Sequence, residues 1–216
     1  MKVSLIGASG FVGSSILKEL TDRGHEVVAI VRDVQKVNAG QGSVTIKSVD
    51  VSDVDALASA VEGTDAVISA YNAGWTNPNI YDDFIAGSKA IQEGVRKSGV
   101  KRLIVIGGAG SLFIDGKQLV DGPDFPAEIK PGATAARDYL DILKSEKDLQ
   151  WTFFSPAIEM HQGITTGRTG HYRLGTERPV FNEEGRAILS VEDLALVIVD
   201  ELENNKYPQQ RFTAAY

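Results

Sequence analysis

The chain has 216 residues, a formal net charge of −7 at pH 7, 43% hydrophobic residues and 24% charged residues. These are ordinary values for a globular protein, and we expect residues 1–216 to form a single domain. The acidic balance argues against a nucleic-acid partner, because neutralising phosphates needs clustered Lys and Arg. The lack of cysteine excludes disulfides and thiolate chemistry.

Apolar strands and amphipathic helices alternate along most of the chain. Short apolar runs rich in β-branched residues are typical of buried parallel strands, whereas apolar residues three and four positions apart are typical of helices. The first pattern predicts strands at 3–6, 26–31, 43–51, 66–70, 102–106 and 150–154. The second pattern predicts helices at 12–23, 54–61, 81–97, 133–147 and 190–202.

Two helix starts carry capping signals. Ser52 and Asp55 stand in capping-box spacing before the helix at 54–61, and Ser190 is followed by Asp193 at the start of the last helix. We therefore expect Ser52 and Ser190 to cap these two helices.

Repeated strand–helix alternation requires crossover connections. It predicts an α/β fold, a Rossmann-like doubly wound parallel sheet with helices on both faces. The last third of the chain differs, because "GHYRLG", "RPVF" and "RAILS" are strand-like pieces broken by Gly and Pro. We interpret residues 150–190 as a small C-terminal addition on the substrate side of a nucleotide-binding core.

The chain offers no targeting or membrane segment. The stretch between Met1 and Gly7 is too short for the apolar core of a signal peptide. No run approaches the roughly 18 apolar residues that a membrane span needs. We expect a cytoplasmic protein without membrane contact, either a monomer or a homodimer.

Glycines recur at every third position where the first strand becomes the first helix: Gly7, Gly10 and Gly13. A helix N-terminus offers unpaired amides and a partial positive charge to a phosphate. Gly7 permits the tight turn, Gly10 removes a Cβ that would hold a pyrophosphate away, and Gly13 allows close helix packing. Ser9 can add a hydroxyl donor. The pattern predicts dinucleotide binding, with a purely structural turn as the alternative.

The end of the second strand bears on the choice of cofactor. Arg32 suits the 2′-phosphate of NADP, and Lys36 could lie on the same side. Asp33 could instead bind the ribose hydroxyl of NAD, so both cofactors remain open and NADP is favoured. Ligands of open parallel sheets lie outside the carboxyl ends of the strands. The later strand ends should therefore line the same cleft: Asp50 and Val51, Ala70, Tyr71 and Asn72, and Gly107 and Gly108.

The motifs "GASGFVG", "VRD" and "DV" resemble the atypical short-chain dehydrogenase/reductases. "IVIGGAGSLF", "LVDGPDFP", "DLQWTFFSPA" and the tail "SVEDLALVIVDELE…QRFTAAY" resemble more narrowly the bacterial NADH-flavin reductases. These are relatives of the NmrA-like proteins and of the flavin/biliverdin-IXβ reductase. The match covers nearly the whole chain, and its second half is the more specific part.

This resemblance implies a bound NADP(H) or NAD(H) and hydride transfer to a flavin, a quinone or a similar flat acceptor. The family's cofactor-binding positions carry over to the pyrophosphate (Gly7, Ser9, Gly10, Phe11, Val12), the 2′-phosphate (Arg32), the adenine (Asp50, Val51), the nicotinamide side (Ala70, Tyr71, Gly107, Gly108) and its closure (Ser155, Pro156, Ala157).

One departure from the larger superfamily concerns the proton donor. That superfamily uses Tyr-x-x-x-Lys with a Ser after strand five, where this chain has Gly107 and Gly108. Tyr139 and Lys144 are five residues apart, which places them about 140° apart around a helix. We expect Tyr139 in the core and Lys144 in solvent, so no catalytic residue is assigned. Flavin or quinone reduction tolerates this loss, because the chemistry resides in nicotinamide and acceptor.

Three residues are candidates for the acceptor pocket: Ser111, His161 and Trp75. Each has a structural alternative as a turn residue, a loop residue or a packing residue. Residues 121–126 could form a lid. His25 and His171 are too far from His161 in sequence to suggest a metal site.

Two functions remain open. The favoured one is an NAD(P)H-dependent reductase of flavins or quinones. The alternative is an NmrA-like sensor that binds NADP(H) without turnover and signals to a partner protein. A sugar-nucleotide epimerase is disfavoured, because the Tyr-x-x-x-Lys pair is missing.

Overall fold

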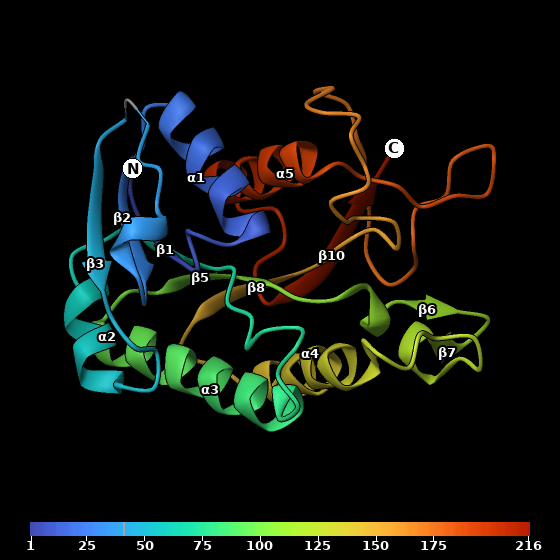
Figure 1. Ribbon diagram of the computed structural model, residues 1–216, viewed down its shortest axis with the longest axis horizontal. Helices are drawn as coiled ribbons and strands as arrows, with labels where there is room; N and C mark the ends of the chain where they lie inside the picture. The colour runs from blue at the N-terminus through green and yellow to red at the C-terminus, as the bar shows by residue number, and fades with distance from the viewer. Residues whose placement is uncertain (41) are drawn as a thin grey trace.

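The computed structural model describes residues 1–40 and 42–216 (Figure 1). Its strands are β1 (Lys2–Ile6), β2 (Glu26–Val31), β3 (Val44–Ser48), β4 (Ala66–Ser69), β5 (Arg102–Ile106), β6 (Phe113–Ile114), β7 (Lys117–Gln118), β8 (Gln150–Ser155), β9 (Arg173–Gly175) and β10 (Gln210–Ala215). Its α-helices are α1 (Phe11–Asp22), α2 (Val54–Val61), α3 (Ile80–Ser98), α4 (Lys130–Leu143) and α5 (Val191–Asn204). Short 3₁₀ helices are η1 (Val34–Lys36), η2 (Ala109–Ser111) and η3 (Leu119–Asp121).

Eight strands form one sheet in the order β3-β2-β1-β4-β5-β8-β10-β9. All neighbouring pairs are parallel except β10 with β9, which are antiparallel. The chain order reverses between β1 and β4, so the crevice at their carboxyl ends is where such sheets bind ligands. This confirms the predicted Rossmann-like fold.

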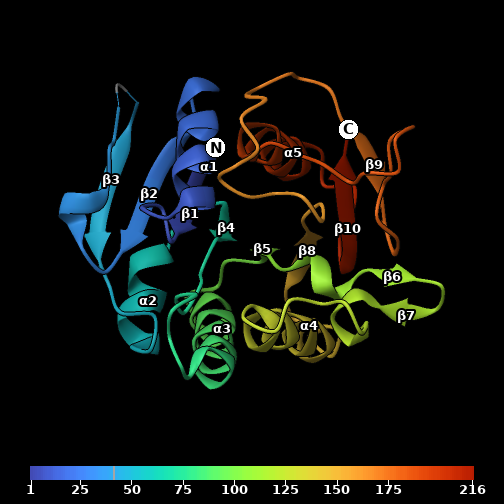
Figure 2. The same ribbon diagram turned by 45° about the vertical axis from the view of Figure 1, so that its right-hand side comes forward.

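Helices cover both faces of the sheet. In Figures 1 and 2, α1 and α5 lie on one side and α2, α3 and α4 on the other. The alternation of side chains along β5 shows why both faces are apolar. Ile104 and Ile106 join the core cluster under α1 and α5, and Leu103 and Val105 join the cluster under the other three helices.

Helix caps are partly as predicted. The Ser190 hydroxyl accepts a hydrogen bond from the Asp193 amide at 3.1 Å, which confirms its role as N-cap of α5. The prediction for α2 was wrong by one residue. Asp53 is the N-cap and accepts from the Ala56 amide at 3.0 Å, because Ser52 is held in a turn by Asp50.

Other boundaries also differ from the predictions. Helix α4 spans Lys130–Leu143 instead of 133–147, since Pro131 is favourable in a first helical turn. "RPVF" and "RAILS" do not form strands, apart from an isolated bridge between Ile188 and Glu159. The pattern also missed the β6–β7 hairpin and β10. None of the helices described by the structure is long and apolar enough to cross a membrane.

Candidate functional site

Two of the three glycines are required by the protein itself. Gly7 has φ +81°, and a Cβ there would lie 2.6 Å from the Ala70 carbonyl oxygen. A Cβ on Gly13 would lie 2.0 Å from the Gly7 carbonyl oxygen. These glycines therefore allow α1 to start directly against the end of β1 and beside β4.

Gly10 has no such packing reason. Its φ is −79°, which any residue can adopt, and a Cβ would meet only the Gly7 carbonyl oxygen at 3.4 Å. The missing side chain leaves open space in front of the first turn of α1, where Gly10 is an N-cap without a capping side chain. The first turn also holds no acidic residue.

Donors converge on this space. Throughout residues 1–40 and 42–216, the amides of Phe11 and Val12 find no hydrogen-bond acceptor. Ser9 is exposed in the same turn. Unpaired amides at a helix N-terminus bind anions, and here they face a gap that a Cβ would fill. The turn therefore fits a pyrophosphate.

The end of β2 presents Arg32 to solvent. Within the described ranges no carboxylate lies within 4.0 Å of its guanidinium. Asp33 is engaged elsewhere, because its carboxylate caps η1 by accepting from the Gln35 amide at 3.0 Å. Lys36 lies 3.8 Å from Asp33 on the exposed side of the same short helix.

Asp50 follows β3 and is held rigidly. Its carboxylate accepts from the Ser52 amide at 2.9 Å and from the Ser52 hydroxyl at 2.8 Å. These bonds, together with the charge of Arg32, lower the pKa of Asp50. Val51 is half-buried beside it in the cluster under α2 and α3. Asp50 and Arg32 thus share one end of the crevice.

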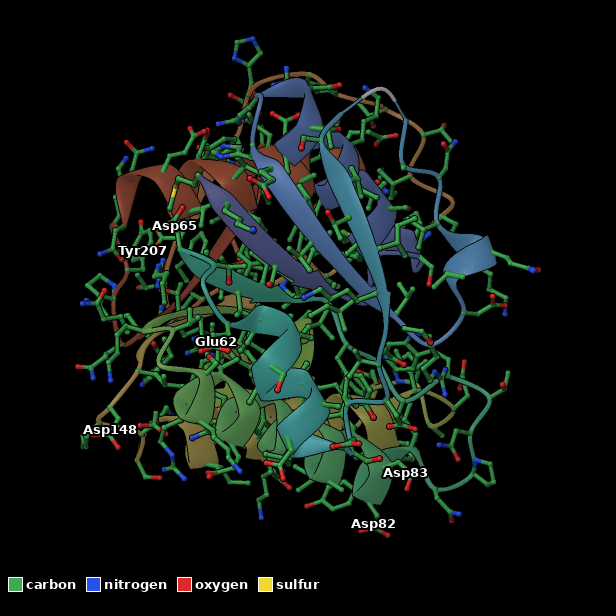
Figure 3. The ribbon with its side chains drawn as sticks, turned by 90° about the vertical axis from the view of Figure 1, so that its left-hand side faces the viewer. Glu62, Asp65, Asp82, Asp83, Asp148 and Tyr207 are labelled. Carbon is green, nitrogen blue, oxygen red and sulfur yellow. The ribbon has the colours of Figure 1, made fainter. Side chains whose placement is uncertain are left out.

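Tyr71 follows β4 and lies within reach of the charges of Arg32 and Asp50. Its ring rests on Gly87 of α3, where a Cβ would be 2.4 Å from the hydroxyl, and stacks on Phe84 at 5.9 Å. The hydroxyl donates to the Asp83 carbonyl at 3.0 Å. Asp83 lies in the first turn of α3 and is labelled in Figure 3. Burial raises the pKa of this phenol, and the charges of Asp83, Arg32 and Asp50 also act on it. Its place beside the nicotinamide stays a prediction.

The remaining strand ends line the other half of the crevice. Ala70 donates its amide to Ile6 at 2.9 Å, and Asn72 is exposed and accepts from the Gly74 amide at 2.7 Å. A Cβ on Gly107 would lie 1.9 Å from the Phe153 ring, so no serine fits there. Gly108 is less constrained, since a Cβ would meet Ala136 at 3.4 Å.

The predicted closing residues after β8 lie in the interior. Ser155, Pro156 and Ala157 are buried, and the Ser155 hydroxyl lies 2.9 Å from that of Ser111. Ser111 is itself fully buried and donates to the Gly108 carbonyl at 2.9 Å. The Ser111 hydroxyl therefore joins the loop after β5 to the end of β8 and does not face the crevice.

The other pocket candidates lie at the surface. Trp75 is 58% exposed, and its ring lies against Gly132 at the start of α4. His161 is exposed, and its Nδ1 accepts from the Gly163 amide at 3.1 Å. In the predicted lid at 121–126, Asp121 pairs with Arg137 at 3.2 Å. Within the described residues no group of three or more His, Asp or Glu side chains could hold a metal ion.

Tyr139 is a core residue, as predicted. It is 1% exposed, its hydroxyl donates to the Gln92 side chain at 3.3 Å, and burial raises its pKa. Lys144 pairs with Asp141 at 2.8 Å on the surface. The two side chains do not meet, and neither reaches the crevice.

Tyr139→Phe should leave turnover unchanged and lower the free energy of unfolding by about 1 kcal/mol, the usual net contribution of one hydrogen bond. The substitution removes only the bond to Gln92. Steady-state kinetics and urea unfolding measure the two effects. A large fall in kcat with intact folding would identify Tyr139 as a proton donor after all.

A cavity of about 200 Å³ lies away from this crevice, between α5 and the amino end of β10. Its acidic residues are already paired: Asp200 with Arg23 at 2.8 Å and Glu201 with Arg102 at 2.7 Å. Asp148 directly precedes β8 and so lies at the amino end of that strand, whereas Asp83, in the first turn of α3, lies on the other side of the view in Figure 3. We assign no site to this cavity.

Comparison with known proteins identifies the family. A family model described as "NAD(P)H-binding" matches residues 7–205. The chain belongs to this NAD(P)H-binding family. The matched range contains the glycine turn, Arg32 and every other strand end of the crevice. The protein is thus a Rossmann-type, oxidoreductase-like chain whose cofactor is a nicotinamide nucleotide.

Full-length relatives of this NAD(P)H-binding protein carry different names. "Uncharacterized protein YwnB" of Bacillus subtilis is 36% identical over 216 residues, covering 99% of this chain and 97% of the relative. A structure named "putative epimerase" from Bacteroides thetaiotaomicron is 45% identical, with a TM-score of 0.91 and coverage of 100% and 96%. Another from Streptococcus pneumoniae, named "a putative NADH-flavin reductase", is 37% identical, with a TM-score of 0.84 and coverage of 100% and 99%. The two structures share the fold of this chain, and their names differ on the reaction.

Sequence reasoning missed two buried acids that organise the crevice's surroundings. Glu19 is 5% exposed on α1, and Asp193 is fully buried on α5. Both bind the segment that follows β8. A glutamate on the buried face of an apolar helix was the available signal for Glu19. Asp193 was interpreted as part of a helix cap.

Proposed function

We propose that this protein is an NAD(P)H-dependent reductase that transfers hydride to a flavin, a quinone or a similar flat acceptor. The observation that carries the proposal is the open space at Gly10, bordered by unpaired amides, in a crevice that the side chains of Tyr139 and Lys144 do not face. A reductase of conjugated acceptors needs the space and the unpaired amides to bind its cofactor. It does not need a Tyr/Lys pair as proton donor.

Each part of the crevice has a proposed task. The amides of Phe11 and Val12, with Ser9 and Gly10, hold the pyrophosphate. Asp50 and Val51 border the adenine. Reduced nicotinamide, when bound, supplies the hydride. Ala70, Gly107 and Gly108 orient its ring, and residues 155–157 close that side. The protein positions two flat rings and excludes water, while solvent supplies the proton.

Trp75 and Tyr71 are proposed contacts of flat rings, and His161 a proposed lining residue of the acceptor side. Trp75 fits this task best, because more than half of its surface is free and its other side rests on Gly132. The name of the Streptococcus pneumoniae structure supports a flavin as acceptor. Ser111 has no proposed contact with the acceptor, since its hydroxyl is fully buried.

Stopped-flow mixing of NADPH-loaded protein with FMN and with menadione tests the reaction directly. We expect nicotinamide oxidation to accelerate with at least one of them. An absence of acceleration with both acceptors, in protein shown by titration to bind NADPH, would contradict the proposal.

The preferred cofactor is proposed to be NADP. Arg32 is exposed and has no carboxylate partner in the described part of the chain, while Asp33 is engaged as the cap of η1. A free guanidinium can form a forked, charge-assisted pair with a 2′-phosphate. An acidic residue that caps a turn is poorly placed to bind a ribose hydroxyl.

Arg32→Glu should weaken NADPH binding about 10- to 100-fold, equivalent to roughly 1.5–3 kcal/mol for a charge-assisted pair, and change NADH binding little. Isothermal titration with both cofactors measures the difference. Lys89→Glu is the matched control, because it makes the same charge change on an exposed part of α3. Equal losses for both cofactors would refute the NADP assignment.

The second candidate is a sensor that binds NADP(H) without turnover. The burial of Tyr139 and the lack of room for a serine at Gly107 favour it, since both remove conventional catalytic groups. A sensor should bind oxidised and reduced cofactor with very different affinities, and it should not oxidise the reduced form with any acceptor. The stopped-flow experiment and paired titrations separate the two functions.

We further propose that residues 1–216 act as one domain in the cytoplasm, as a monomer or homodimer. The sheet supports a single domain, because β8 and β10 continue the same sheet next to β5. Limited proteolysis tests the single domain, since two domains would yield stable fragments. Light scattering measures the oligomeric state, and cell fractionation measures the location.

A further inference from the structure

The segment 158–172, called the strap below, leaves the carboxyl end of β8 and runs beside α1 and α5 before reaching β9 (Figure 2). It has almost no regular structure of its own. At its start, Met160 packs against the core cluster that also holds Ala157 and Ala8, the residue after Gly7. The strap therefore begins directly after the proposed closing residues of the crevice, and its first part packs on the same core cluster as the residue that follows Gly7.

Asp193 holds the far end of the strap. Its carboxylate accepts from the Thr169 amide at 2.9 Å, the Thr169 hydroxyl at 2.6 Å and the Gly170 amide at 3.0 Å. It also accepts from the Tyr216 hydroxyl at 2.7 Å. Asp193 is fully buried, so these donors replace water entirely. A carboxylate with this many donors fixes the backbone that carries them.

This arrangement departs from an ordinary capping box. In a capping box the acidic side chain would reach back to the amide of the N-cap residue. Here the Ser190 amide donates to the Tyr216 hydroxyl at 3.1 Å, which leaves the carboxylate of Asp193 free for the strap. The Ser190 hydroxyl also donates to the Gly167 carbonyl at 2.7 Å. The N-cap and the first turn of α5 thus bind residues 167–170 of the strap directly.

A second anchor ties the strap to α1. Arg168 donates to both carboxylate oxygens of Glu19, at 3.0 and 2.9 Å, and Arg23 donates to the same carboxylate at 2.9 Å. Glu19 is 5% exposed, and the bond from Arg168 is the main reason that its pKa is lowered. Helix α1 begins at the proposed pyrophosphate site. The strap therefore joins the closing side of the crevice to the helix that starts at the phosphate side.

We propose that Asp193 is a positioning residue, which sets the acceptor side of the crevice by holding the strap against α5 while Glu19 holds it against α1. The inference rests on the proposed reductase function, because it assigns a task to the acceptor side of that same site. Asp193 and Glu19 touch neither cofactor nor acceptor, and they act through residues 158–172.

Asp193→Asn tests the proposal. The amide keeps the size of the side chain but turns one acceptor into a donor facing other donors. We expect hydrogen exchange in residues 158–172 to accelerate about tenfold or more, as anchoring is lost. The KM for menadione should rise about fivefold or more with a smaller change in kcat, and the NADPH dissociation constant should change less than about twofold.

Glu192→Gln is the matched control, since it removes one negative charge from the same first turn at an exposed position. It should change neither hydrogen exchange nor KM. If Asp193→Asn does not fold, Thr169→Val removes a single hydroxyl donor and should shift both measurements in the same direction by less. Equal exchange in Asp193→Asn and Glu192→Gln, or a loosened strap with unchanged KM, would overturn the proposal.

The outcomes for the strap and for the reductase are distinguishable. Wild-type protein that oxidises NADPH with neither FMN nor menadione would contradict the proposed function and the acceptor role of the strap with it. Wild-type turnover combined with an unchanged KM in Asp193→Asn would contradict the strap alone. The exchange measurement needs no turnover and tests the anchoring by itself.

Discussion

Gly10→Ala should weaken NADPH binding about tenfold or more while the protein stays folded. The new Cβ would meet only the Gly7 carbonyl oxygen at 3.4 Å, and the backbone at φ −79° suits alanine. It would, however, occupy the space in front of the α1 amides. Holding a phosphate away from one amide costs about 1.5–3 kcal/mol, the contribution of a charge-assisted hydrogen bond. Isothermal titration and thermal unfolding measure affinity and stability in the same variant.

Gly13→Ala is the contrasting variant. Its Cβ would lie 2.0 Å from the Gly7 carbonyl oxygen, so α1 must shift away from β1. Overpacking of this kind costs about 1–3 kcal/mol or more in stability. Wild-type affinity in Gly10→Ala would refute the pyrophosphate site. Normal stability in Gly13→Ala would refute the distinction between packing glycine and binding glycine.

Glu201→Gln should destabilise the protein by about 3–5 kcal/mol, the usual cost of removing one partner of a buried ion pair. Arg102 is 7% exposed and donates to Glu201 at 2.7 Å, and burial lowers its pKa despite this partner. The Glu201 carboxylate also accepts from the Lys206 and Tyr207 amides, at 3.0 and 3.1 Å. Loss of the carboxylate leaves a buried guanidinium without its counter-charge. Urea unfolding measures the change.

Asp55→Asn provides the comparison, because Asp55 pairs with Lys97 on the surface and such pairs contribute about 0–1 kcal/mol. The double variant Arg102→Met/Glu201→Gln should recover most of the stability, since it removes both buried charges together and keeps a side-chain oxygen for the Lys206 and Tyr207 amides. A small effect of Glu201→Gln, similar to that of Asp55→Asn, would show that water reaches the pair. No recovery in the double variant would show that the pair contributes more than its charges.

The nucleotide-binding half of the fold could be predicted because its signals are local. A buried parallel strand such as Glu26–Val31 is a continuous apolar run, and the helix at Ile80–Ser98 ends on Gly99 in a left-handed conformation. Strand β10 gave no comparable signal, because "QRFTAA" lacks a run of β-branched residues and owes its pairing to β8. The same holds for the two-residue strands of the β6–β7 hairpin.

The candidate site could be predicted as a set of strand ends but not as a geometry. Ser111 follows β5 as a pocket residue would, yet its hydroxyl meets Ser155, which lies 44 positions away in the sequence. Tyr71 follows β4, yet its ring packs on α3, because Gly87 has no side chain in its way. Contacts between distant segments decided the direction of both side chains. Sequence spacing carries no information about them.

By itself, the sequence determined the order of strands and helices from β1 to β5, the glycine turn after β1 and the separation of Tyr139 from Lys144 around their helix. Each follows from near neighbours, through side-chain periodicity and turn chemistry. Only the tertiary structure decided which glycine is free for a ligand and which is required for packing, because that depends on atoms of remote segments such as the Ala70 carbonyl and the Phe153 ring. It also decided that Asp193 and Glu19 hold the strap, since both buried acids accept from residues 168–170, which are far from them in sequence.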